Sequence, residues 1–322
     1  MSNAVLDIRE LTTRFTSRRG PVTAVDRLSL KLHPAETLGL VGESGCGKSV
    51  TALSVLRLLP QPAGSIAGGR ILFNGRDLVP LPEKHMRRIR GNNISMIFQE
   101  PMTSLNPVYP VGFQIVEAIR RHRPMNRRAA RQETVRMLSL VGLPDPGARV
   151  NDYPHQLSGG MRQRVMIAMA LSCQPAVMIA DEPTTALDVT IQAQILDLIN
   201  RLKSDIGMAV MLITHDLGVV AETCQQVAVM YTGRIVEEAD VRTLFRKAAH
   251  PYTVGLFQSR PKLDGRRHKL QPIPGAVPSL LRLPPGCSFQ DRCPRGDDQC
   301  RRDPPWAKIG AGHRARCWHP VE

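Results

Sequence analysis

The sequence predicts an α/β protein whose core is a largely parallel sheet. Short apolar runs suited to buried strands alternate with helix-length segments, and a glycine-rich turn joins one such run, Thr37–Val41, to the helix-like segment Lys48–Leu59. The chain has 322 residues, of which 42% are hydrophobic and 22% charged, so a mostly disordered protein is excluded. At about 150 residues per domain, this length suggests two lobes, with one elaborated domain as the alternative.

The expected elements follow in chain order from local patterns. From about residue 99 to 156, loops containing Pro and Asn surround two helices, which indicates a mainly helical insert. Buried-strand patterns resume after this insert, and beyond about Asp240 the pattern weakens into a linker rich in Pro and Gly. Besides the two segments above, we expect strands at Val5–Leu11, Leu28–Leu32, Ala176–Ala180, Ala209–Ile213 and Val227–Tyr231, helices at Gly112–His122 and Arg127–Val141, and the linker at Pro272–Gly286.

The chain is strongly basic, because 43 Lys and Arg against 28 Asp and Glu give a formal net charge of +15. This charge alone is compatible with nucleic acid, an anionic membrane surface or phosphate ligands. No apolar run approaches the roughly 18 to 20 residues of a membrane-spanning helix. The first residues are mixed and charged, unlike a secretory signal. We therefore expect a cytosolic chain that does not cross a bilayer by itself.

The strongest motif is a full G-x-x-x-x-G-K-S sequence between an expected strand and an expected helix, which predicts a P-loop NTPase core. Its glycines let backbone N–H groups turn toward phosphates, and the helix N-terminus adds positive potential. Lys48 would contact the β and γ phosphates, and the Ser49 hydroxyl would ligate Mg²⁺. The alternative, an incidental glycine-rich turn, is disfavoured by the strand-loop-helix setting. The predicted ATP-binding residues here are Gly42, Glu43, Ser44, Gly45, Cys46, Gly47, Lys48, Ser49 and Val50, with Cys46 as a small filler.

Two carboxylates follow the aliphatic strand that ends at Ala180. A parallel strand buried on both faces delivers its last residues at the carboxyl edge of the sheet, where phosphate loops also lie. Asp181 is suited to hold Mg²⁺, and Glu182 is suited to act as a general base that polarises water. An aliphatic run with Asp-Glu is weak evidence alone, but it becomes strong beside the phosphate loop.

A third motif precedes that strand. Ser158 is a predicted N-cap, the following glycines leave backbone N–H groups accessible, and a helix continues to Leu171. Such a helix start is a potential anion site, although an isolated Ser-Gly-Gly is more often an ordinary capped helix. The motif comprises Leu157, Ser158, Gly159, Gly160, Met161, Arg162 and Gln163.

In this order, the three motifs resemble the nucleotide-binding subunit of an ATP-binding-cassette (ABC) transporter over about residues 5–240, with a RecA-like core. The resemblance assigns Gln99 to Mg²⁺ and the attacking water, and His215 to the γ-phosphate. It implies that Phe15 stacks on adenine and that the loop Ala186, Leu187 and Asp188 crosses a dimer interface. The implied magnesium ligands are Ser49, Gln99 and Asp181.

The resemblance also implies a mechanism. Two cassettes pack head to tail, so that each ATP lies between the phosphate loop of one chain and the Ser158 helix start of the other. ATP binding closes the dimer, hydrolysis at Glu182 releases it, and the helical insert passes this movement to two transmembrane permease subunits. All the motif residues are present, so we expect a catalytically competent ATPase at the cytoplasmic face of the membrane.

Several segments resemble the oligopeptide and dipeptide importer ATPases and their C-terminal extension. An extracytoplasmic solute-binding protein is implied as a further component of such a system. Relatives in that subfamily also serve nickel, glutathione and other small solutes, so the transported compound stays open. The segments are Gln99–Pro107, His250–Thr253, Pro272–Pro278 and Gly286–Pro294.

Four of the seven cysteines, Cys287, Cys293, Cys300 and Cys317, lie in the last 36 residues. Their C-x₅-C-x₆-C-x₁₆-C spacing lacks the close pairs of common zinc fingers, and the cytosol disfavours disulfides. Some members of the resembled subfamily hold a [4Fe-4S] cluster there, which four thiolates can ligate. We predict this cluster, with zinc or unligated thiols as alternatives.

Other functions are open on composition alone. An ABC-type ATPase of a nucleic-acid machine would carry long coiled coils, which are not visible. A basic nucleic-acid-binding module draws support from arginines in the helical insert, but these have little aromatic interleaving for base stacking. A third alternative is a regulatory ATPase that binds partners and does not drive transport. The importer-like extension argues against all three, and we expect no nucleic acid partner. The arginines are Arg120, Arg121, Arg123, Arg127, Arg128, Arg131 and Arg136.

These interpretations predict three parts. Residues 1–98 and 157–240 form the ATP-binding core, residues 99–156 form a helical subdomain, and residues 241–322 form an irregular extension with the four cysteines.

Overall fold

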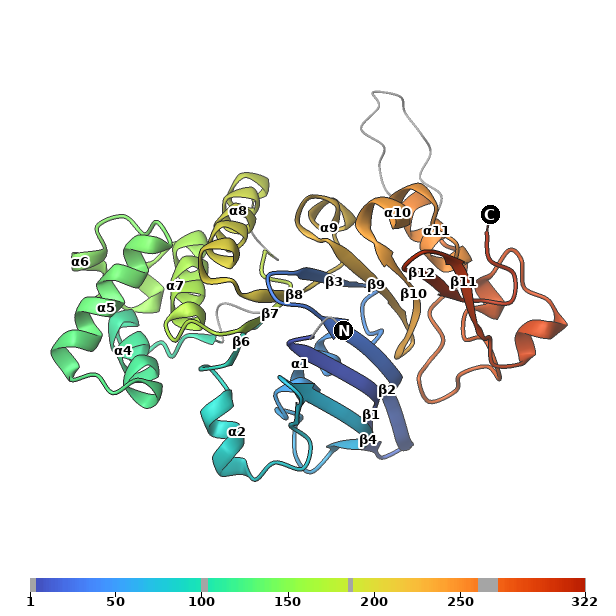
Figure 1. Ribbon diagram of the computed structural model, residues 1–322, viewed down its shortest axis with the longest axis horizontal. Helices are drawn as coiled ribbons and strands as arrows, with labels where there is room; N and C mark the ends of the chain where they lie inside the picture. The colour runs from blue at the N-terminus through green and yellow to red at the C-terminus, as the bar shows by residue number, and fades with distance from the viewer. Residues whose placement is uncertain (1–3, 100–103, 185–187, 260–271, 322) are drawn as a thin grey trace. The chain divides into compact units, whose positions relative to one another are not determined.

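The computed structural model describes residues 4–99, 104–184, 188–259 and 272–321 (Figure 1). The chain forms two compact units. The first unit comprises Met1–Val5, Leu32–Glu36 and Pro80–Leu212, and the second comprises Leu6–Lys31, Thr37–Val79 and Ile213–Glu322.

The second unit contains two groups of strands. One is a four-stranded sheet of order β2-β1-β4-β5, in which β4 pairs antiparallel with both β1 and β5. The other has the order β11-β12-β10-β9-β3, with β3 and β9 parallel and the remaining pairs antiparallel. The strands are β1 (Leu6–Ser17), β2 (Gly20–Leu32), β3 (Thr37–Val41), β4 (Gly64–Phe73), β5 (Arg76–Asp77), β9 (Gln226–Tyr231), β10 (Arg234–Asp240), β11 (Trp306–Gly310) and β12 (His313–Arg316).

Short helices accompany these strands. Helix α1 directly follows the glycine-rich loop after β3, while the later helices belong to the C-terminal extension or to the connection before β9. The helices of the second unit are α1 (Lys48–Val55), α9 (Leu217–Thr223), α10 (Val241–Arg246) and α11 (Pro251–Gln258), with the 3₁₀ turns η2 (Gln290–Arg292) and η3 (Asp298–Arg301).

The first unit combines parallel strands with the helical insert. Strands β6 and β7 pair in parallel, and β8 begins in this unit and ends in the second. Helices α4, α5 and α7 pack against one another (Figure 1). The elements are β6 (Ile94–Ile97), β7 (Val177–Asp181), β8 (Ala209–Thr214), α2 (Glu83–Ile89), α4 (Val111–His122), α5 (Arg127–Leu140), α6 (Pro146–Arg149), η1 (Pro154–Gln156), α7 (Gly159–Leu171) and α8 (Val189–Ile206).

The apolar spacing of the insert explains its packing. Val111, Ile115 and Ile119 recur every four residues on α4, so they share one face, and all are fully buried. Asn126 caps α5 by accepting a hydrogen bond from the Ala129 N–H at 2.9 Å. The predicted helices of the insert are therefore present, and their ends lie within one residue of the expected positions.

Three elements differ in length from the prediction, one of them β2, which spans Gly20–Leu32 where the expected strand is Leu28–Leu32. Helix α1 ends at Val55, although the pattern continues to Leu59. Arg57 has left-handed backbone with φ of 52°, and Pro60 disfavours helical backbone at the residue before it. Strand β1 runs on to Ser17 through a register shift near Thr12, where the pattern of alternating burial is interrupted.

The extension is more regular than its sequence suggests. Strands β11 and β12 form a hairpin, and β12 pairs with β10. The hairpin lacks a run of alternating apolar residues; instead the guanidinium of Arg314 lies 4.4 Å from the centre of the Trp306 ring. Strand β11 is short and is held by this cation–π contact and by its pairing with β12. Such a strand is hard to recognise from the hydrophobic pattern of the sequence.

Candidate functional site

The phosphate loop connects β3 to α1 and depends on two glycines. A Cβ on Gly42 would lie 2.2 Å from the Met230 carbonyl oxygen, and one on Gly47 would lie 2.4 Å from the Ala24 carbonyl oxygen. Gly47 also has φ of 105°, which side chains rarely tolerate. These positions admit no larger residue, because neighbouring backbone closes on the loop from both sides.

Lys48 lies at the start of α1 with 6% exposure. Its Nζ donates hydrogen bonds to the Gly42 and Glu43 carbonyl oxygens at 2.8 and 3.0 Å. The ammonium is thus held over the phosphate loop, where a phosphate oxygen can replace one of these carbonyl oxygens as its hydrogen-bond acceptor. Cys46 is buried within the loop, and burial raises the pKa of its thiol, consistent with a filler.

The other loop positions differ in accessibility. Ser44 and Gly45 are exposed, whereas Ser49 and Val50 are half-buried in the first turn of α1. Sequence reasoning missed two residues that hold Glu43, namely Tyr252 and Arg292 of the extension. The segments His250–Thr253 and Gly286–Pro294 marked the subfamily, but no local pattern connects them to the loop.

In the first unit, the structure brings Gln99 and Glu182 together. The Gln99 Nε2 donates a hydrogen bond to the Glu182 carboxylate at 3.3 Å. Asp181 ends β7 with 3% exposure, and Glu182 follows with left-handed backbone, φ 48°. A carboxylate beside an amide at the end of a parallel strand can orient and activate water.

The signature helix α7 begins as predicted. Ser158 caps it by accepting a hydrogen bond from the Met161 N–H at 3.3 Å. Gln163 is buried, and its side-chain amide donates a hydrogen bond to the carbonyl oxygen of Pro183, the residue after Glu182. The signature helix and the proposed base are therefore joined within the same unit.

The remaining signature positions pack tightly or face solvent. A Cβ on Gly160 would lie 3.1 Å from the Ile191 Cγ2, so α7 approaches α8 closely there. Leu157 is buried, whereas Gly159 is exposed and Arg162 half-buried. Because the start of α7 packs closely against α8 on one side and is exposed on the other, the direction of its backbone N–H groups is fixed.

The predicted interface loop is described only at its end, because Ala186 and Leu187 lie outside the described residues. Asp188 is exposed and caps α8, accepting a hydrogen bond from the Ile191 N–H at 2.9 Å. The carboxylate thereby occupies the start of an 18-residue helix.

The candidate residues divide between the two units. The phosphate loop, Phe15 and His215 belong to the second unit, whereas Gln99, Asp181, Glu182 and the signature helix belong to the first. His215 is exposed directly after β8. Phe15 is half-buried near the end of β1 opposite Gly64.

The four cysteines of the extension lie close enough to interact electrostatically. Burial and, to a smaller extent, the negative charges of the other three thiolates raise the pKa of Cys317 to about 11. Burial likewise raises the pKa of Cys287 to about 11. Thiols that repel one another as thiolates would be stabilised in that form by a shared cation.

A second donor set overlaps the first. Asp297, Cys300 and His319 place one potential ligand atom each within 4.8 Å of one another. The His319 Nε2 lies 2.9 Å from the Asp297 carboxylate, and its backbone N–H donates to the Cys317 sulfur at 3.3 Å. A backbone N–H directed at a thiolate is typical of the surroundings of ligating cysteines.

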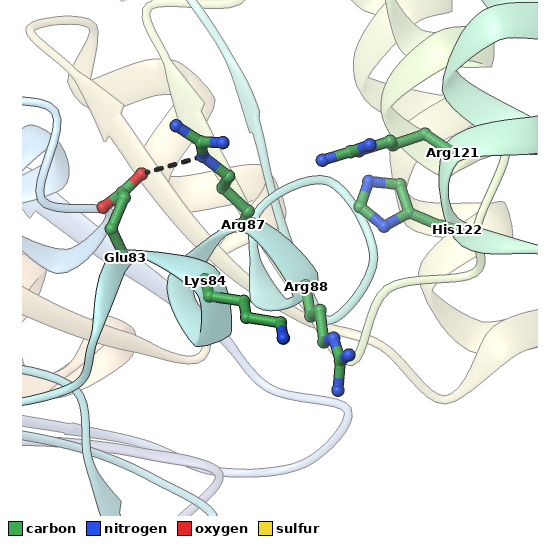
Figure 2. A pocket seen from close by; sticks show the side chains of 6 residues that line it. All are labelled: Glu83, Lys84, Arg87, Arg88, Arg121 and His122. Carbon is green, nitrogen blue, oxygen red and sulfur yellow. Dashed lines mark ion pairs between the residues drawn. The ribbon is translucent and has the colours of Figure 1, made fainter.

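A basic pocket of about 490 Å³ opens between α2 and the end of α4. Figure 2 shows Arg121 and His122 projecting from α4 toward α2, with the Glu83–Arg87 ion pair at 3.6 Å on the opposite side. Among the described residues, the side chains of Lys84, Arg88 and Arg121 form no hydrogen bond or ion pair. The pocket, lined by Glu83, Lys84, Arg87, Arg88, Arg121 and His122, carries excess positive charge and is suited to an anionic group.

Some of the arginines that suggested nucleic acid serve the fold of the insert. Arg123 and Arg136 both bond to Glu133, at 3.1 and 2.8 Å. Arg131 donates to the Asn151 side chain at 2.9 Å. Among the described residues, no helix has the length and apolar composition that would let it span a membrane.

Comparison with known proteins places these features in a family. The ABC transporter family model matches residues 25–185, and the model for the oligopeptide/dipeptide transporter C-terminal region matches residues 236–300. The structure resembles the dimeric bacterial ABC transporter cassette MJ0796 with a TM-score of 0.66 and 26% identity, covering 74% of this chain and 99% of that one. A post-hydrolysis state of the same cassette bound to ADP and Pi matches with a TM-score of 0.66 and 25% identity, over the same shares of the two chains.

Curated relatives align over almost their whole length. The "Probable peptide ABC transporter ATP-binding protein y4tR" of Sinorhizobium fredii is 54% identical over 100% of this chain and 96% of its own. The dipeptide transport ATP-binding protein DppD of Bacillus subtilis is 52% identical, over 98% and 94%. The oligopeptide transport ATP-binding protein OppD of Salmonella typhimurium is 49% identical, over 100% and 95%. The chain therefore belongs to the ABC transporter family, as an ATPase subunit with the oligopeptide/dipeptide transporter C-terminal region.

Proposed function

We propose that this chain hydrolyses ATP to power the import of dipeptides, oligopeptides or related small solutes across the cytoplasmic membrane. Three relatives named for peptide, dipeptide or oligopeptide transport match almost the full chain, including the extension. The observation that carries the catalytic part is the Gln99–Glu182 hydrogen bond at the end of β7, beside the buried Asp181.

The residues divide the chemistry as follows. Backbone N–H groups of the phosphate loop and the Lys48 ammonium bind the β and γ phosphates, while Phe15 stacks on adenine. Glu182 accepts the proton of the attacking water, Gln99 orients that water, and His215 contacts the γ-phosphate. Mg²⁺, held by Ser49, Gln99 and Asp181, would neutralise the charge that develops on the phosphates.

The signature helix acts on a second nucleotide. Its start, which is exposed at Ser158 and Gly159 and half-buried at Gly160, offers N–H groups to the γ-phosphate of an ATP bound by a partner ATPase subunit. That partner is a paralogue or a second copy of this chain. The loop Ala186, Leu187 and Asp188 crosses the same interface. Closure of this dimer is the step that ATP binding drives.

The proposed parts have distinct duties. Residues 1–98 and 157–240 bind and hydrolyse ATP, residues 99–156 transmit the movement, and residues 241–322 form the extension. Two permease subunits receive the movement, and an extracytoplasmic solute-binding protein delivers the cargo. The chain would thus work at the cytoplasmic face of the membrane as a peripheral subunit.

The basic pocket supports a charged contact with the permease. Its arginines and Lys84 come from α2 and α4 of the first unit, and an acidic side chain on a cytoplasmic loop of a permease subunit matches their charge. Such a contact, made through the helical subdomain, would link the ATPase to the membrane partner.

The cysteines of the extension would hold a [4Fe-4S] cluster. Support comes from the mutual electrostatic interaction of the thiols of Cys287, Cys293, Cys300 and Cys317. Zinc is the second candidate, because Asp297 and His319 lie beside Cys300 and are common zinc ligands.

The test is reconstituted transport. The chain, with the membrane subunits that co-purify with it, would be placed in proteoliposomes and supplied with solute-binding protein, ATP and a labelled dipeptide or oligopeptide. We expect ATP-dependent uptake that Glu182→Gln abolishes. Uptake of nickel or another non-peptide solute, with none of peptide, would overturn the proposed cargo; absence of ATP hydrolysis by the complex would overturn the proposed motor.

A further inference from the structure

All three polar groups of Glu43 in the phosphate loop are engaged. Its backbone N–H donates a hydrogen bond to the Tyr252 hydroxyl at 2.9 Å, and its carbonyl oxygen accepts from the Lys48 Nζ at 3.0 Å. Its carboxylate accepts two hydrogen bonds from the Arg292 guanidinium, at 2.8 and 3.1 Å. The side chain of this loop residue therefore contacts the extension.

Arg292 is itself fixed on every side. Its side chain is 5% exposed, and its Nε donates to the Pro274 carbonyl oxygen at 3.0 Å. Its guanidinium also lies 5.9 and 5.8 Å from the ring centres of Tyr231 and Phe289. A two-pronged ion pair in such surroundings has little freedom and little screening by water, unlike a surface salt bridge.

The aromatic rings behind Arg292 connect the core to the extension. The Tyr231 ring, at the end of β9, lies 4.6 Å from that of Tyr252 on α11 and 5.4 Å from that of Phe289. Tyr252 and Phe289 are also 5.4 Å apart, and all three are buried. This packing holds the Tyr252 hydroxyl and the Arg292 guanidinium at fixed positions against Glu43.

We propose that Arg292 is a positioning residue of the ATP site, which through Glu43 holds the phosphate loop in the shape that receives nucleotide phosphates. The inference rests on the proposed ATP site and adds the extension to it. A loop that is already held in shape loses less conformational freedom when phosphate binds. The Arg292–Glu43 pair, here called the clamp, therefore strengthens nucleotide affinity. Once ATP is bound, phosphate contacts replace that support, and the rate of hydrolysis depends little on the clamp.

The test measures nucleotide affinity and hydrolysis in the full chain. We expect Arg292→Ala to raise the dissociation constant of a fluorescent ATP analogue by about tenfold. The hydrolysis rate at saturating ATP should change less than twofold. Arg292→Lys, which keeps the charge but not the two-pronged geometry, should fall between wild type and Arg292→Ala.

A double-mutant cycle identifies the partner. Glu43→Ala should weaken binding to a similar extent, and the double variant should be no weaker than either single one. Arg301→Ala is the matched control, because that arginine belongs to the same extension but its side chain is 73% exposed and pairs only with exposed Asp298 among the described residues. It should bind nucleotide as wild type does.

Other outcomes separate the clamp from the site it serves. Additive effects, or unchanged affinity in folded Arg292→Ala, would overturn the clamp. If thermal unfolding shows that Arg292→Ala does not fold, Glu43→Gln is used in its place. This substitution removes the charge of the Glu43 carboxylate without leaving a cavity. If wild type itself binds no ATP, or Lys48→Ala binds as tightly as wild type, the proposed ATP site fails instead.

Discussion

Glu182 combines an unusual backbone with a neighbour, Gln99, for which we propose a catalytic role. Its φ of 48° lies in a region that residues other than glycine rarely adopt, at a cost of about 1 to 3 kcal/mol. The same residue accepts the Gln99 hydrogen bond and follows the buried Asp181. Such strain persists at functional sites because surrounding structure imposes it, and here β7 and the Pro183 contact with Gln163 do so.

We expect Glu182→Gln to reduce ATP hydrolysis by about 100-fold or more, because the amide cannot accept the proton of the attacking water. Nucleotide affinity should remain within a few-fold of wild type. Phosphate release and fluorescent-nucleotide titration measure the two quantities.

The control is Glu222→Gln, an exposed carboxylate on α9, which should hydrolyse ATP normally. The slow Glu182→Gln variant should also accumulate an ATP-bound dimer, with itself or with a paralogous subunit, visible by size-exclusion chromatography. Hydrolysis at the wild-type rate would remove Glu182 from the role of base.

At the scale of elements, the sequence predicts buried strands well. Strands β3, β7 and β8 lie within one residue of the expected runs, because burial on both faces requires continuous apolar residues. The hairpin of β11 and β12 was not predicted, since its few apolar positions do not alternate. The two carboxylates and the signature cap belong to motifs of adjacent residues and could therefore be predicted from the sequence. The contact between Arg292 and Glu43 could not, because these residues are 249 positions apart in the chain.

Helix α11 begins with a buried histidine. The His250 Nδ1 accepts a hydrogen bond from the Tyr252 N–H at 3.0 Å, which requires an unprotonated nitrogen. Burial lowers the pKa of His250 to about 3, although the Glu237 carboxylate accepts a hydrogen bond from its backbone N–H. The neutral ring is thus part of the folded state.

Stability should consequently fall in acid. Between about pH 6.5 and pH 3 the unfolded chain protonates His250 and the folded chain does not, so its contribution is full above pH 6.5 and declines below it. At pH 5.5 the loss from this residue is about 1.4 kcal/mol relative to pH 7.5. Urea unfolding at both pH values measures it.

His250→Asn keeps a cap acceptor without a titrating ring, so its loss between these pH values should be smaller than that of wild type by about the same amount. The exposed His155→Asn should behave as wild type does. An equal pH dependence in wild type and His250→Asn would contradict a neutral buried ring.

The four cysteines allow a direct analysis of metal content. Anaerobically purified protein should contain about four iron and four sulfide per chain. Cys300→Ser and Cys317→Ser should lose most of this iron and become less stable, because ligand loss uncouples metal binding from folding. Elemental analysis and visible absorption provide the measurement.

Cys173→Ser is the matched control, because this thiol is half-buried in the first unit and should not affect iron. Protein that contains zinc alone would exclude the iron–sulfur cluster. Protein without metal would leave the thiols as unligated packing residues.

At the scale of the whole molecule, the basic side chains behind the net charge of +15 make contacts of several kinds. Arg123, Arg131 and Arg136 form internal contacts in the insert, and Arg292 holds Glu43. The basic pocket retains uncompensated charge. Composition could indicate an anionic partner but not which arginines would meet it, because that division depends on tertiary contacts.

Charge reversal tests the pocket. Arg88→Glu and Arg121→Glu should weaken co-purification with the permease subunits at least tenfold, because each replaces attraction to an acidic group by repulsion. ATP affinity of the isolated chain should be unchanged. Arg127→Glu, an exposed position on α5, is the control. Equal recovery of permease with all three variants would exclude the pocket as a contact.

The Glu43–Arg292 pair also constrains how such sequences can diverge. Loss of Arg292 alone leaves the half-buried Glu43 carboxylate without its cation, and loss of Glu43 alone leaves a guanidinium with 5% exposure without its anion. Either single change should therefore be unfavourable, and we expect the two positions to change together across related chains. Homologues whose tail lacks this arginine should carry an uncharged residue at position 43, and a tail grafted from such a homologue should function only with that replacement.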